Sequence, residues 1–228
     1  MSEARGLGEA KGLGPDGGRE TVHERTYAAI REGLIGGRFV PGKSVTLRGL
    51  AADLGVSPMP VRAAVTRLVA EGALAMTPTR RVSVPKMSRQ RFDELMRVRL
   101  LLEGEAAERA MPGIDDARLV TIRGHDDRLE ACLAAGDVAG YMAANHAFHF
   151  AIYSAEPSTV LVPLIETLWL QFGPFMRNVY QGLDMSIVID QHEVALDAIA
   201  RGDAKALRHA IEADIADGMS IIGRTGLD

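Results

Sequence analysis

Four polar side chains in the C-terminal part of the chain are of the types that bind transition metals. Asn145 and His149 are four residues apart and share one face of a helix, while His192 and Asp214 belong to two later segments. Two neutral imidazoles and a carboxylate, with the amide oxygen as a weak fourth donor, suit a divalent ion such as zinc, nickel or iron. The alternative is that each histidine is an ordinary surface or hydrogen-bonded core residue.

Two arginines in largely apolar surroundings each require an anion, because a guanidinium group does not lose its charge. Arg99 lies in an apolar stretch, and a carboxylate would satisfy both arms of its side chain. That carboxylate belongs either to a bound ligand or to Glu103, one helical turn further on. Arg177 follows an aromatic stretch and raises the same question. The candidate effector-binding residues are therefore Arg99, Arg177, Asn145, His149, His192 and Asp214.

A helical bundle is needed to bring these side chains together, and the chain after residue 87 has the corresponding pattern. We predict helices near residues 88–110, 115–135, 138–155, 158–181, 185–201 and 203–222, separated mainly by glycine and proline residues. The metal-binding candidates fall on the third, fifth and sixth of these. About six helices with short loops predict an antiparallel bundle, in which a ligand site lies between helices.

A second group of candidate residues, nearer the N-terminus, is largely cationic. Residues 47–54 and 58–68 each place apolar side chains at helical spacing, and Gly55 between them suits the left-handed turn that ends a helix. Ser57 is a candidate N-cap, and Pro58 is compatible with a first helical turn. The outer side of the second helix can contact phosphates and base edges. The candidate DNA-binding residues of this helix pair are Arg48, Ser57, Met59, Arg62, Thr66 and Arg67.

Two short strand-like segments, 73–76 and 82–84, follow the helix pair and flank a turn that contains Arg80 and Arg81. A helix-turn-helix followed by a basic hairpin predicts a winged helix, whose hairpin tip contacts the DNA backbone or enters the minor groove. Residues 22–35 are predicted to form a further helix that packs against this unit. The alternative is a solvated basic loop in an ordinary helical protein, but the order of the features favours DNA binding.

The charge of the chain differs between its two parts. Residues 1–86 contain 13 lysines and arginines against 8 acidic residues, a net charge of +5, whereas residues 87–228 contain 13 against 22, a net charge of −9. A basic part suits a polyanion, and an acidic part is repelled by one. We therefore predict a mainly α-helical protein with a disordered tail at 1–20, a winged helix-turn-helix DNA-binding domain at 21–86 and an all-helical effector-binding and dimerisation domain at 87–228.

The composition argues against several other classes of protein. Cys132 is the only cysteine, so an intrachain disulfide is impossible and the composition suits the reducing cytoplasm. No stretch approaches the roughly 20 apolar residues of a membrane span, and the tail lacks the apolar run of a signal peptide. We expect a cytoplasmic protein without a membrane partner.

Taken in order, these motifs resemble the GntR superfamily of bacterial transcription regulators, and specifically its FadR-type subfamily with a helical FCD effector-binding domain. The resemblance covers almost all of the chain after the tail. The segments that carry it are Leu50-Ala51, Gly55-Val56-Ser57, Pro60-Val61-Arg62, Leu68, Glu71-Gly72, Val98-Arg99, Leu102-Glu103, Glu105-Ala106-Ala107, Asn145–His149, Gln191-His192-Glu193 and Gly202-Asp203.

The resemblance implies a homodimer that binds a roughly palindromic double-stranded DNA operator and responds to a small carboxylate metabolite. It implies that Arg48 and Arg62 contact DNA and that Arg99 receives the carboxylate of the effector. Two positions depart from the family pattern: Pro58 stands where a base-contacting arginine is usual, and Arg81 stands at the wing-tip glycine. The operator is therefore expected to differ from the common one.

Family members often bind a metal through an aspartate or asparagine, a histidine one turn later and two further histidines. Asn145, His149 and His192 match this set, but Asp214 occupies the last position. The exchange replaces a nitrogen with a harder oxygen donor, which alters the metal preference or leaves a metal-free polar pocket.

The favoured function is a ligand-responsive transcriptional regulator, more often a repressor in this family, and not an enzyme. A metal-dependent enzyme of the two-histidine, one-carboxylate type would use the same His149, His192 and Asp214. However, no separate general base is identifiable, and a winged helix has no use in such an enzyme. A metal sensor would use the same ligands, with the metal itself as the signal.

Overall fold

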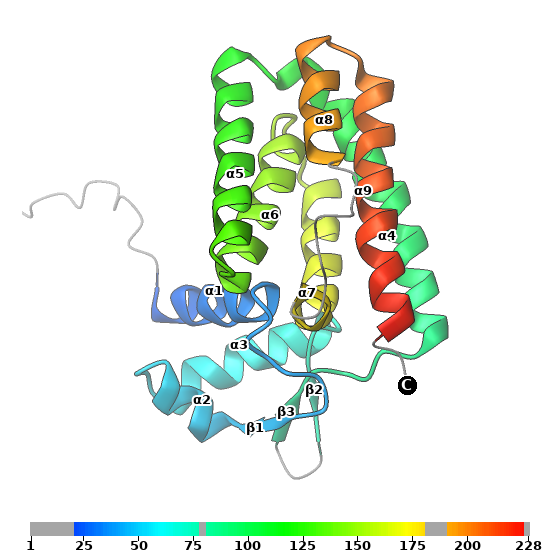
Figure 1. The fold of residues 1–228 in the computed structure, drawn as a ribbon. Helices are drawn as coiled ribbons and strands as arrows, with labels where there is room; N and C mark the ends of the chain where they lie inside the picture. Colours follow the sequence, from blue (N-terminus) through cyan, green and yellow to red (C-terminus); the bar gives the residue numbers. More distant parts are fainter. Residues whose placement is uncertain (1–20, 78–80, 181–190, 226–228) are drawn as a thin grey trace, which may run out of the picture.

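Among the residues that the structure describes, three helices and a small sheet precede a bundle of six helices (Figure 1). The computed structural model describes residues 21–77, 81–180 and 191–225. The predicted tail, residues 1–20, and the candidate DNA contact Arg80 lie outside these ranges. The order of elements confirms the predicted fold class, a winged helix-turn-helix followed by a helical bundle.

Short polar side chains cap the first two helices. The Thr21 hydroxyl accepts from the backbone N–H of Glu24 at 3.2 Å, and the Glu24 carboxylate accepts from the backbone N–H of Thr21 at 2.7 Å. Thr46 caps the second helix by accepting from the N–H of Gly49. The three helices are α1 (Val22–Ile35), α2 (Leu47–Asp53) and α3 (Pro58–Ala70).

The turn between α2 and α3 forms as predicted. Gly55 has a φ of 64°, a left-handed conformation that costs glycine little. Ser57 is the N-cap of α3, but its side chain makes no cap hydrogen bond. The inner face of α3 packs against α1, and burial of each large apolar side chain contributes about 1.5–3 kcal/mol. The buried residues of this face are Val61, Ala64, Val65 and Leu68, as the spacing predicts.

The sheet is antiparallel, with strand order β1-β3-β2. Its strands are β1 (Ser44–Thr46), β2 (Ala75–Met76) and β3 (Arg81–Ser83). The predicted strand at 73–76 is shorter than expected, because the N–H groups of Ala73 and Leu74 both donate to the carbonyl of Leu68 at the end of α3. We did not predict β1, whose three residues are too few to produce a recognisable alternation.

The bundle consists of α4 (Arg89–Ala110), α5 (Asp116–Ala134), α6 (Val138–Tyr153), α7 (Leu161–Tyr180), α8 (Gln191–Ala200) and α9 (Ala204–Thr225). A short 3-10 turn (Met111–Gly113) follows α4. Helix α4 packs along α9, α5 along α6, and α8 along α9. These bounds confirm the predicted helices; residues 185–190 of the fifth prediction lie outside the described ranges.

Helix α1 connects the winged helix to the bundle, because it contacts both α7 and α6 (Figure 1). An irregular segment, residues 84–88, joins β3 to α4. The division into domains at residues 21–86 and 87–228 stays a prediction. Within the described residues, no helix combines the length and apolarity needed to cross a membrane.

Candidate functional site

The outer side of the helix-turn-helix presents cationic and polar side chains to solvent. Arg48 on α2 and Arg62 on α3 are exposed, and within the described residues neither guanidinium group has a hydrogen-bond or ion-pair partner. Met59, at the start of α3, is 73% exposed. Ser57 and Thr66 are also exposed, and the Thr66 hydroxyl donates to the carbonyl of Arg62. This surface has the side chains needed for contacts to phosphates and bases.

Arg67 differs from the other DNA-binding candidates, because its guanidinium group already has partners. Its Cζ atom lies 3.9 Å from the centre of the Tyr27 ring, and its Nε donates to Glu71 at 3.0 Å. The Tyr27 hydroxyl also donates to Glu71, at 2.7 and 2.9 Å to the two carboxylate oxygens. Arg67 therefore ties α3 to α1, a contact that helical spacing alone did not indicate.

In the hairpin of the wing, Thr77 after β2 and Arg81 at the start of β3 are joined by hydrogen bonds. The N–H of Thr77 donates to the carbonyl of Arg81 at 2.9 Å, and the N–H of Arg81 donates to the Thr77 hydroxyl at 3.1 Å. The Arg81 side chain is exposed. A basic side chain at this position of the hairpin can contact a phosphate of the DNA backbone.

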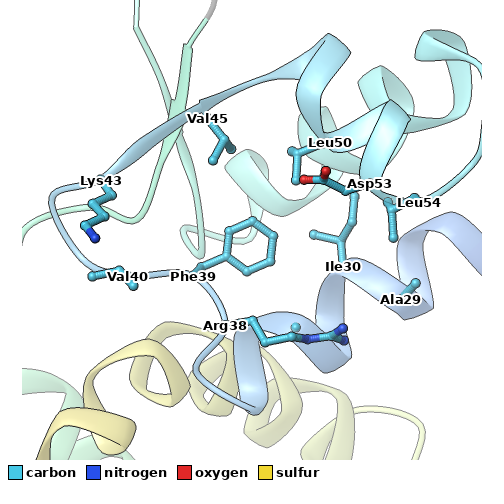
Figure 2. Close-up of a pocket in the computed structure, with 11 residues that line it drawn as sticks. Ala29, Ile30, Arg38, Phe39, Val40, Lys43, Val45, Leu50, Asp53 and Leu54 are labelled. Carbon is cyan, nitrogen blue, oxygen red and sulfur yellow. The ribbon is translucent and has the colours of Figure 1, made fainter.

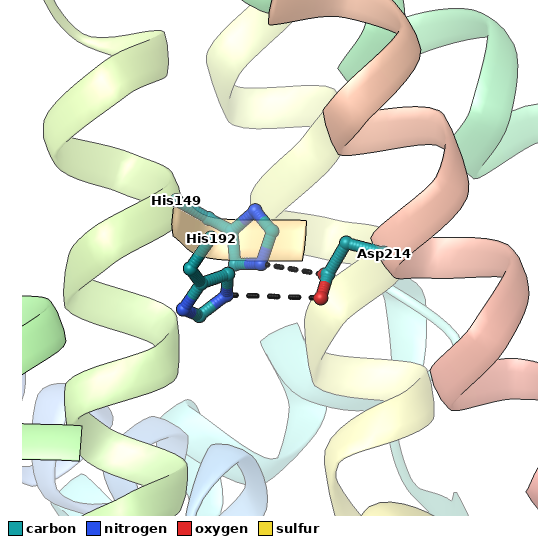
Figure 3. Close-up of side chains that lie close together, drawn as sticks. All are labelled: His149, His192 and Asp214. Atoms are coloured by element: carbon teal, nitrogen blue, oxygen red, sulfur yellow. Dashed lines mark ion pairs between the residues drawn. The ribbon is translucent and has the colours of Figure 1, made fainter. Parts of the chain in front are cut away.

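In the bundle, three of the predicted ligands come from three helices and meet at one point. His149 on α6, His192 on α8 and Asp214 on α9 each offer a ligand atom, and these atoms lie within 4.8 Å of one another. Both imidazole rings point toward the Asp214 carboxylate (Figure 3). Asn145 is 5% exposed and lies one turn before His149 on α6.

The hydrogen bonds around His149 fix which of its nitrogens can bind a metal. The Tyr153 hydroxyl donates to Glu103 at 2.9 Å, so its oxygen accepts from Nδ1–H of a neutral His149 at 3.0 Å. Burial and the nearby Glu103 carboxylate raise the pKa of Tyr153 well above its usual value, which keeps the hydroxyl protonated. The lone pair of His149 is therefore on Nε2, the nitrogen that faces Asp214.

His192 is oriented in a similar way by a residue from a fourth helix. Its Nδ1 lies 2.9 Å from Oδ1 of Asp126, a buried aspartate on α5. The ring also stacks on Phe148, with centroids 3.9 Å apart and an interplanar angle of 15°. A carboxylate on one ring nitrogen leaves the other available as a metal ligand, as is common in histidine metal sites.

Each histidine thus directs its second nitrogen toward a carboxylate oxygen. Nε2 of His149 lies 3.1 Å from Oδ2 of Asp214, and Nε2 of His192 lies 3.7 Å from Oδ1. Among the described residues, Nε2 of His149 is buried without a partner in hydrogen-bond geometry. Two acceptors that face each other require a positive charge between them, either a proton or a metal ion. The separations are close to the roughly 3–3.5 Å between ligands of a zinc-sized ion.

The charge of Asp214 is favoured by its surroundings. Burial opposes ionisation, but the neighbouring imidazoles of His149 and His192 and the guanidinium group of Arg99 lower the pKa of Asp214 below its usual value. Its side chain is 29% exposed, so one side of the set remains accessible. An ionised carboxylate and two oriented imidazoles fit a divalent transition metal.

Glu103 is the anion that Arg99 contacts. The two side chains form an ion pair on α4 and are 5% and 0% exposed. Glu103 also accepts from Nε1 of Trp169 at 2.9 Å, in addition to Tyr153. The role of Arg99 as an effector ligand stays a prediction, and the side chain of Arg177 on α7 lies outside the described residues.

Sequence reasoning missed Asp126 and the network around Glu103. A signal for Asp126 was present, because it interrupts the apolar spacing of Ile122 and Leu129 on the buried face of α5. A carboxylate at such a position requires a partner. Its partner His192 is 66 residues away in sequence, so spacing could not identify the pair.

A cavity of about 290 Å³ lies in the winged-helix region, apart from the metal-ligand set (Figure 2). Its floor is apolar and includes Ile30, Leu50 and Leu54, while Arg38 and Lys43 are among the residues of its wall. The lining residues belong to α1, β1, α2, the segment that joins α1 to β1, and the C-cap of α2, Leu54. The cavity therefore contributes nothing to the candidate metal centre.

Comparison with known proteins identifies both parts of the chain. Residues 22–84 match the family model for bacterial regulatory proteins of the gntR family, and residues 94–217 match the model for the FCD domain. The HTH-type transcriptional regulator McbR of Escherichia coli K12 is 28% identical over 85% of this chain and 89% of its own. A probable D-xylose utilization operon transcriptional repressor of Paenarthrobacter nicotinovorans is 24% identical over 87% of each chain.

A solved structure agrees with these sequence relatives. The E. coli McbR/YncC structure superposes with a TM-score of 0.84 at 26% identity and covers 90% of this chain and 98% of that chain. Both matched families consist of transcriptional regulators rather than enzymes, so the metal-dependent enzyme considered above is not supported. The chain belongs to the GntR family and is a winged-helix transcriptional regulator with an FCD effector-binding domain.

Proposed function

We propose that this regulator is a homodimer that binds a palindromic operator and responds to a small carboxylate effector, which binds in the bundle next to a divalent metal ion. Two features carry the proposal: an exposed cationic surface on the helix-turn-helix and a set of metal-binding side chains inside the bundle. The guanidinium groups of Arg48 and Arg62 are exposed without partners among the described residues, whereas His149, His192 and Asp214 converge inside the bundle.

Exposed apolar side chains on α4 and α7 support the homodimer. On α4, Val98 is 40% exposed and Leu101 is 64% exposed. Leu164 on α7 is 50% exposed, and Val160, the residue before α7, is 67% exposed. The two helices contact each other, and exposed apolar side chains on adjacent helices are typical of a protein interface. A two-fold dimer would present two α3 helices to half-sites about 34 Å apart, which explains a palindromic operator.

The charge of the proposed metal site indicates the chemical class of the effector. His149 and His192 are neutral ligands, so Asp214 would neutralise only one of the two positive charges of the ion; Asn145 is a candidate fourth ligand. The ion would supply a Lewis-acidic position for an anionic oxygen. A small carboxylate satisfies that position and would bring its own charge into reach of Arg99.

We further propose that the protein acts as a repressor in the cytoplasm, where bacterial DNA lies. The similarity to a probable operon repressor supports this direction of regulation. An effector that binds preferentially to the dimer geometry incompatible with DNA would release the operator, and a few kcal/mol of coupling is enough.

The proposal is tested by selecting duplexes from a random library with the purified protein and sequencing them. We expect an inverted repeat, and we expect Zn²⁺ or Ni²⁺ to bind wild-type protein in calorimetry but to bind His192→Ala much more weakly. A protein that selects no sequence at low or moderate salt would contradict the operator. Equal metal binding by His192→Ala would contradict the metal site.

A metal sensor would use the same three ligands, and their preset arrangement makes it the second candidate. The two functions differ in the effect of metal alone. Graded loss of duplex binding as Zn²⁺ is added, reversed by a chelator, would favour a sensor. A metal that changes only stability would favour a carboxylate effector.

A further inference from the structure

The C-terminal end of the recognition helix α3 is held by side chains of the bundle. Glu71 is the C-cap of α3, and Gly72 follows with a φ of 72°. The carbonyl groups of Arg67, Leu68 and Val69 accept from the backbone N–H groups that follow α3, whereas those of Glu71 and Gly72, just beyond the helix, accept from side chains. Here Nε2 of Gln171 on α7 donates to the carbonyl of Glu71 at 3.2 Å, and Nη2 of Arg91 on α4 donates to the carbonyl of Gly72 at 3.3 Å.

The two donors are also linked to each other. Nη2 of Arg91 donates to Oε1 of Gln171 at 2.6 Å. The Arg91 cation lies at the negative end of the α3 dipole, where a positive charge is favourable. We name this arrangement the α3 clamp; it consists of Arg91, Gln171 and the carbonyl groups of Glu71 and Gly72.

Helix α7 also packs against α1, and two of the contacts between them are close. Glu166 pairs with Arg31 at 3.1 Å. Gly173 lies against the end of α1 so closely that a Cβ atom there would be 2.5 Å from the carbonyl oxygen of Leu34 and 2.7 Å from Cα of Ile35. With the clamp, these contacts fix α7 to α1 and α3 together, so a displacement of α7 must move the recognition helix.

The same helix reaches the candidate effector site. Nε1 of Trp169 donates to Glu103 at 2.9 Å, and the Trp169 ring centroid lies 5.3 Å from that of His149. Trp169 and Gln171 are two residues apart, so they project toward different sides of α7. One side of α7 therefore contacts the effector site while another contacts the end of α3.

The geometry points to Gln171 and Arg91 as positioning residues that transmit the state of the bundle site to the recognition helix through α7. This inference rests on the proposed function, because it assumes that the two sites bind an effector and DNA. Coupling between two sites is reciprocal, so DNA bound at α3 must also perturb the surroundings of Trp169.

Trp169 makes the test direct, because it is the only tryptophan in the chain. A fluorescently labelled duplex selected by the wild-type protein is titrated, and binding is followed by anisotropy of the label while Trp169 emission is recorded in parallel. We expect DNA binding to change the emission of Trp169, although the residue is 4% exposed and lies on the bundle helix α7.

The variant Gln171→Glu retains an acceptor for Arg91 but loses the donor to the carbonyl of Glu71. We expect it to bind the duplex with the DNA-induced emission change largely lost, and Arg91→Gln to behave in the same way. Gln90→Glu is the matched control, because the Gln90 side chain is exposed and, among the described residues, bonds only to Glu94 on its own helix. Circular dichroism verifies that each variant is folded, and Arg91→Gln replaces Gln171→Glu if the latter is not.

Two results would overturn the inference while leaving the proposed function intact. One is a wild-type protein that binds the duplex without any change in Trp169 emission. The other is an undiminished change in both clamp variants. A wild-type protein that binds no duplex would instead overturn the proposed function, and with it the assumption on which the inference rests.

Discussion

At the scale of single residues, the bundle uses two aspartates for different tasks. Asp214 faces both imidazoles with its own oxygens, whereas Asp126 contacts the opposite nitrogen of His192 and cannot reach the shared point. A carboxylate behind a histidine fixes the ring and increases its basicity as a ligand. The chemistry of the site therefore depends on a residue outside the ligand set.

Asp126→Asn tests this dependence. The amide keeps the size of the side chain but removes the charge behind His192, so we expect Zn²⁺ affinity to fall by roughly 10- to 100-fold, as for other carboxylates behind metal ligands. Isothermal titration calorimetry measures the change. Asp127→Asn, at the exposed neighbouring position, should leave the affinity unchanged; equal losses in the two variants would show that Asp126 has no special role.

Arg62→Ala tests the recognition surface. If the exposed guanidinium makes a bidentate base contact, its removal should cost about 1–3 kcal/mol on the selected duplex and less on random DNA. Competition titrations with labelled duplex give both values. Arg128→Ala, an exposed arginine on α5, serves as the control. A uniform loss on all sequences would make Arg62 a phosphate contact.

At the scale of elements, α3 is supported along its length by α1 and at its end by the bundle. Tyr27 and Arg67 both converge on Glu71, whose carboxylate is 19% exposed. Because Glu71 also offers its backbone carbonyl to Gln171, a single residue connects α1, α3 and α7. The orientation of the recognition helix is therefore set by this junction.

Tyr27→Phe should weaken the junction by about 1–2 kcal/mol, since it removes a half-buried hydrogen bond to a charged group. Burial and the hydrogen bond to Glu71 raise the pKa of Tyr27 to about 12. The stabilisation is thus complete below the ordinary tyrosine pKa of about 10 and lost as the pH rises toward 12. Urea unfolding should show a wild-type advantage at pH 8 that shrinks above pH 10; a constant advantage would contradict this account.

Gly173→Ala should separate α7 from α1, because backbone atoms occupy the space that the Cβ needs. We expect a loss of about 1–3 kcal/mol in the free energy of unfolding, typical of overpacking, together with weaker duplex binding. Gly124→Ala on α5 is the control, since among the described residues no atom apart from the neighbouring backbone of α5 lies within 4 Å of its Cβ position. That change should stabilise the protein, so urea titrations should give opposite signs.

The sequence predicted these elements well because helical periodicity and helix-ending residues agree locally. The bounds of α1 follow from its apolar spacing and from Gly36-Gly37, and α4 begins one residue after the start of the helix predicted at 88–110, because Ser88 is its N-cap. The α3 clamp and the pair of His192 with Asp126 could not be predicted, because each joins residues far apart in sequence through tertiary packing. Periodicity identifies the buried face of a helix but not which partner that face meets.

At the scale of the whole molecule, the basic N-terminal part and the acidic remainder have opposite preferences for DNA. The net charges of +5 and −9 in residues 1–86 and 87–228 favour an orientation in which only the winged helix approaches the phosphates. The positive excess is modest, so a single winged helix gives limited affinity. Two of them on one dimer would bind adjacent half-sites together.

Leu101→Glu should therefore disrupt both assembly and DNA binding. A charge at this 64% exposed position on α4 would be buried in the proposed interface, whereas Val120→Glu, at a 72% exposed position on α5, would remain in solvent. Light scattering should give a monomer for Leu101→Glu only, with a large loss of operator affinity. A dimeric Leu101→Glu protein would place the interface elsewhere.

The connection from the bundle site to α3 through α7 has a genetic consequence, because the residues that transmit the signal are different from those that bind the effector or the DNA. Alleles that bind the operator but respond to no inducer should arise at Arg91 and Gln171, neither of which belongs to the metal-ligand set or to the exposed face of α3. By the same logic, paralogues can evolve a new inducer through changes around His149 while they retain their operator.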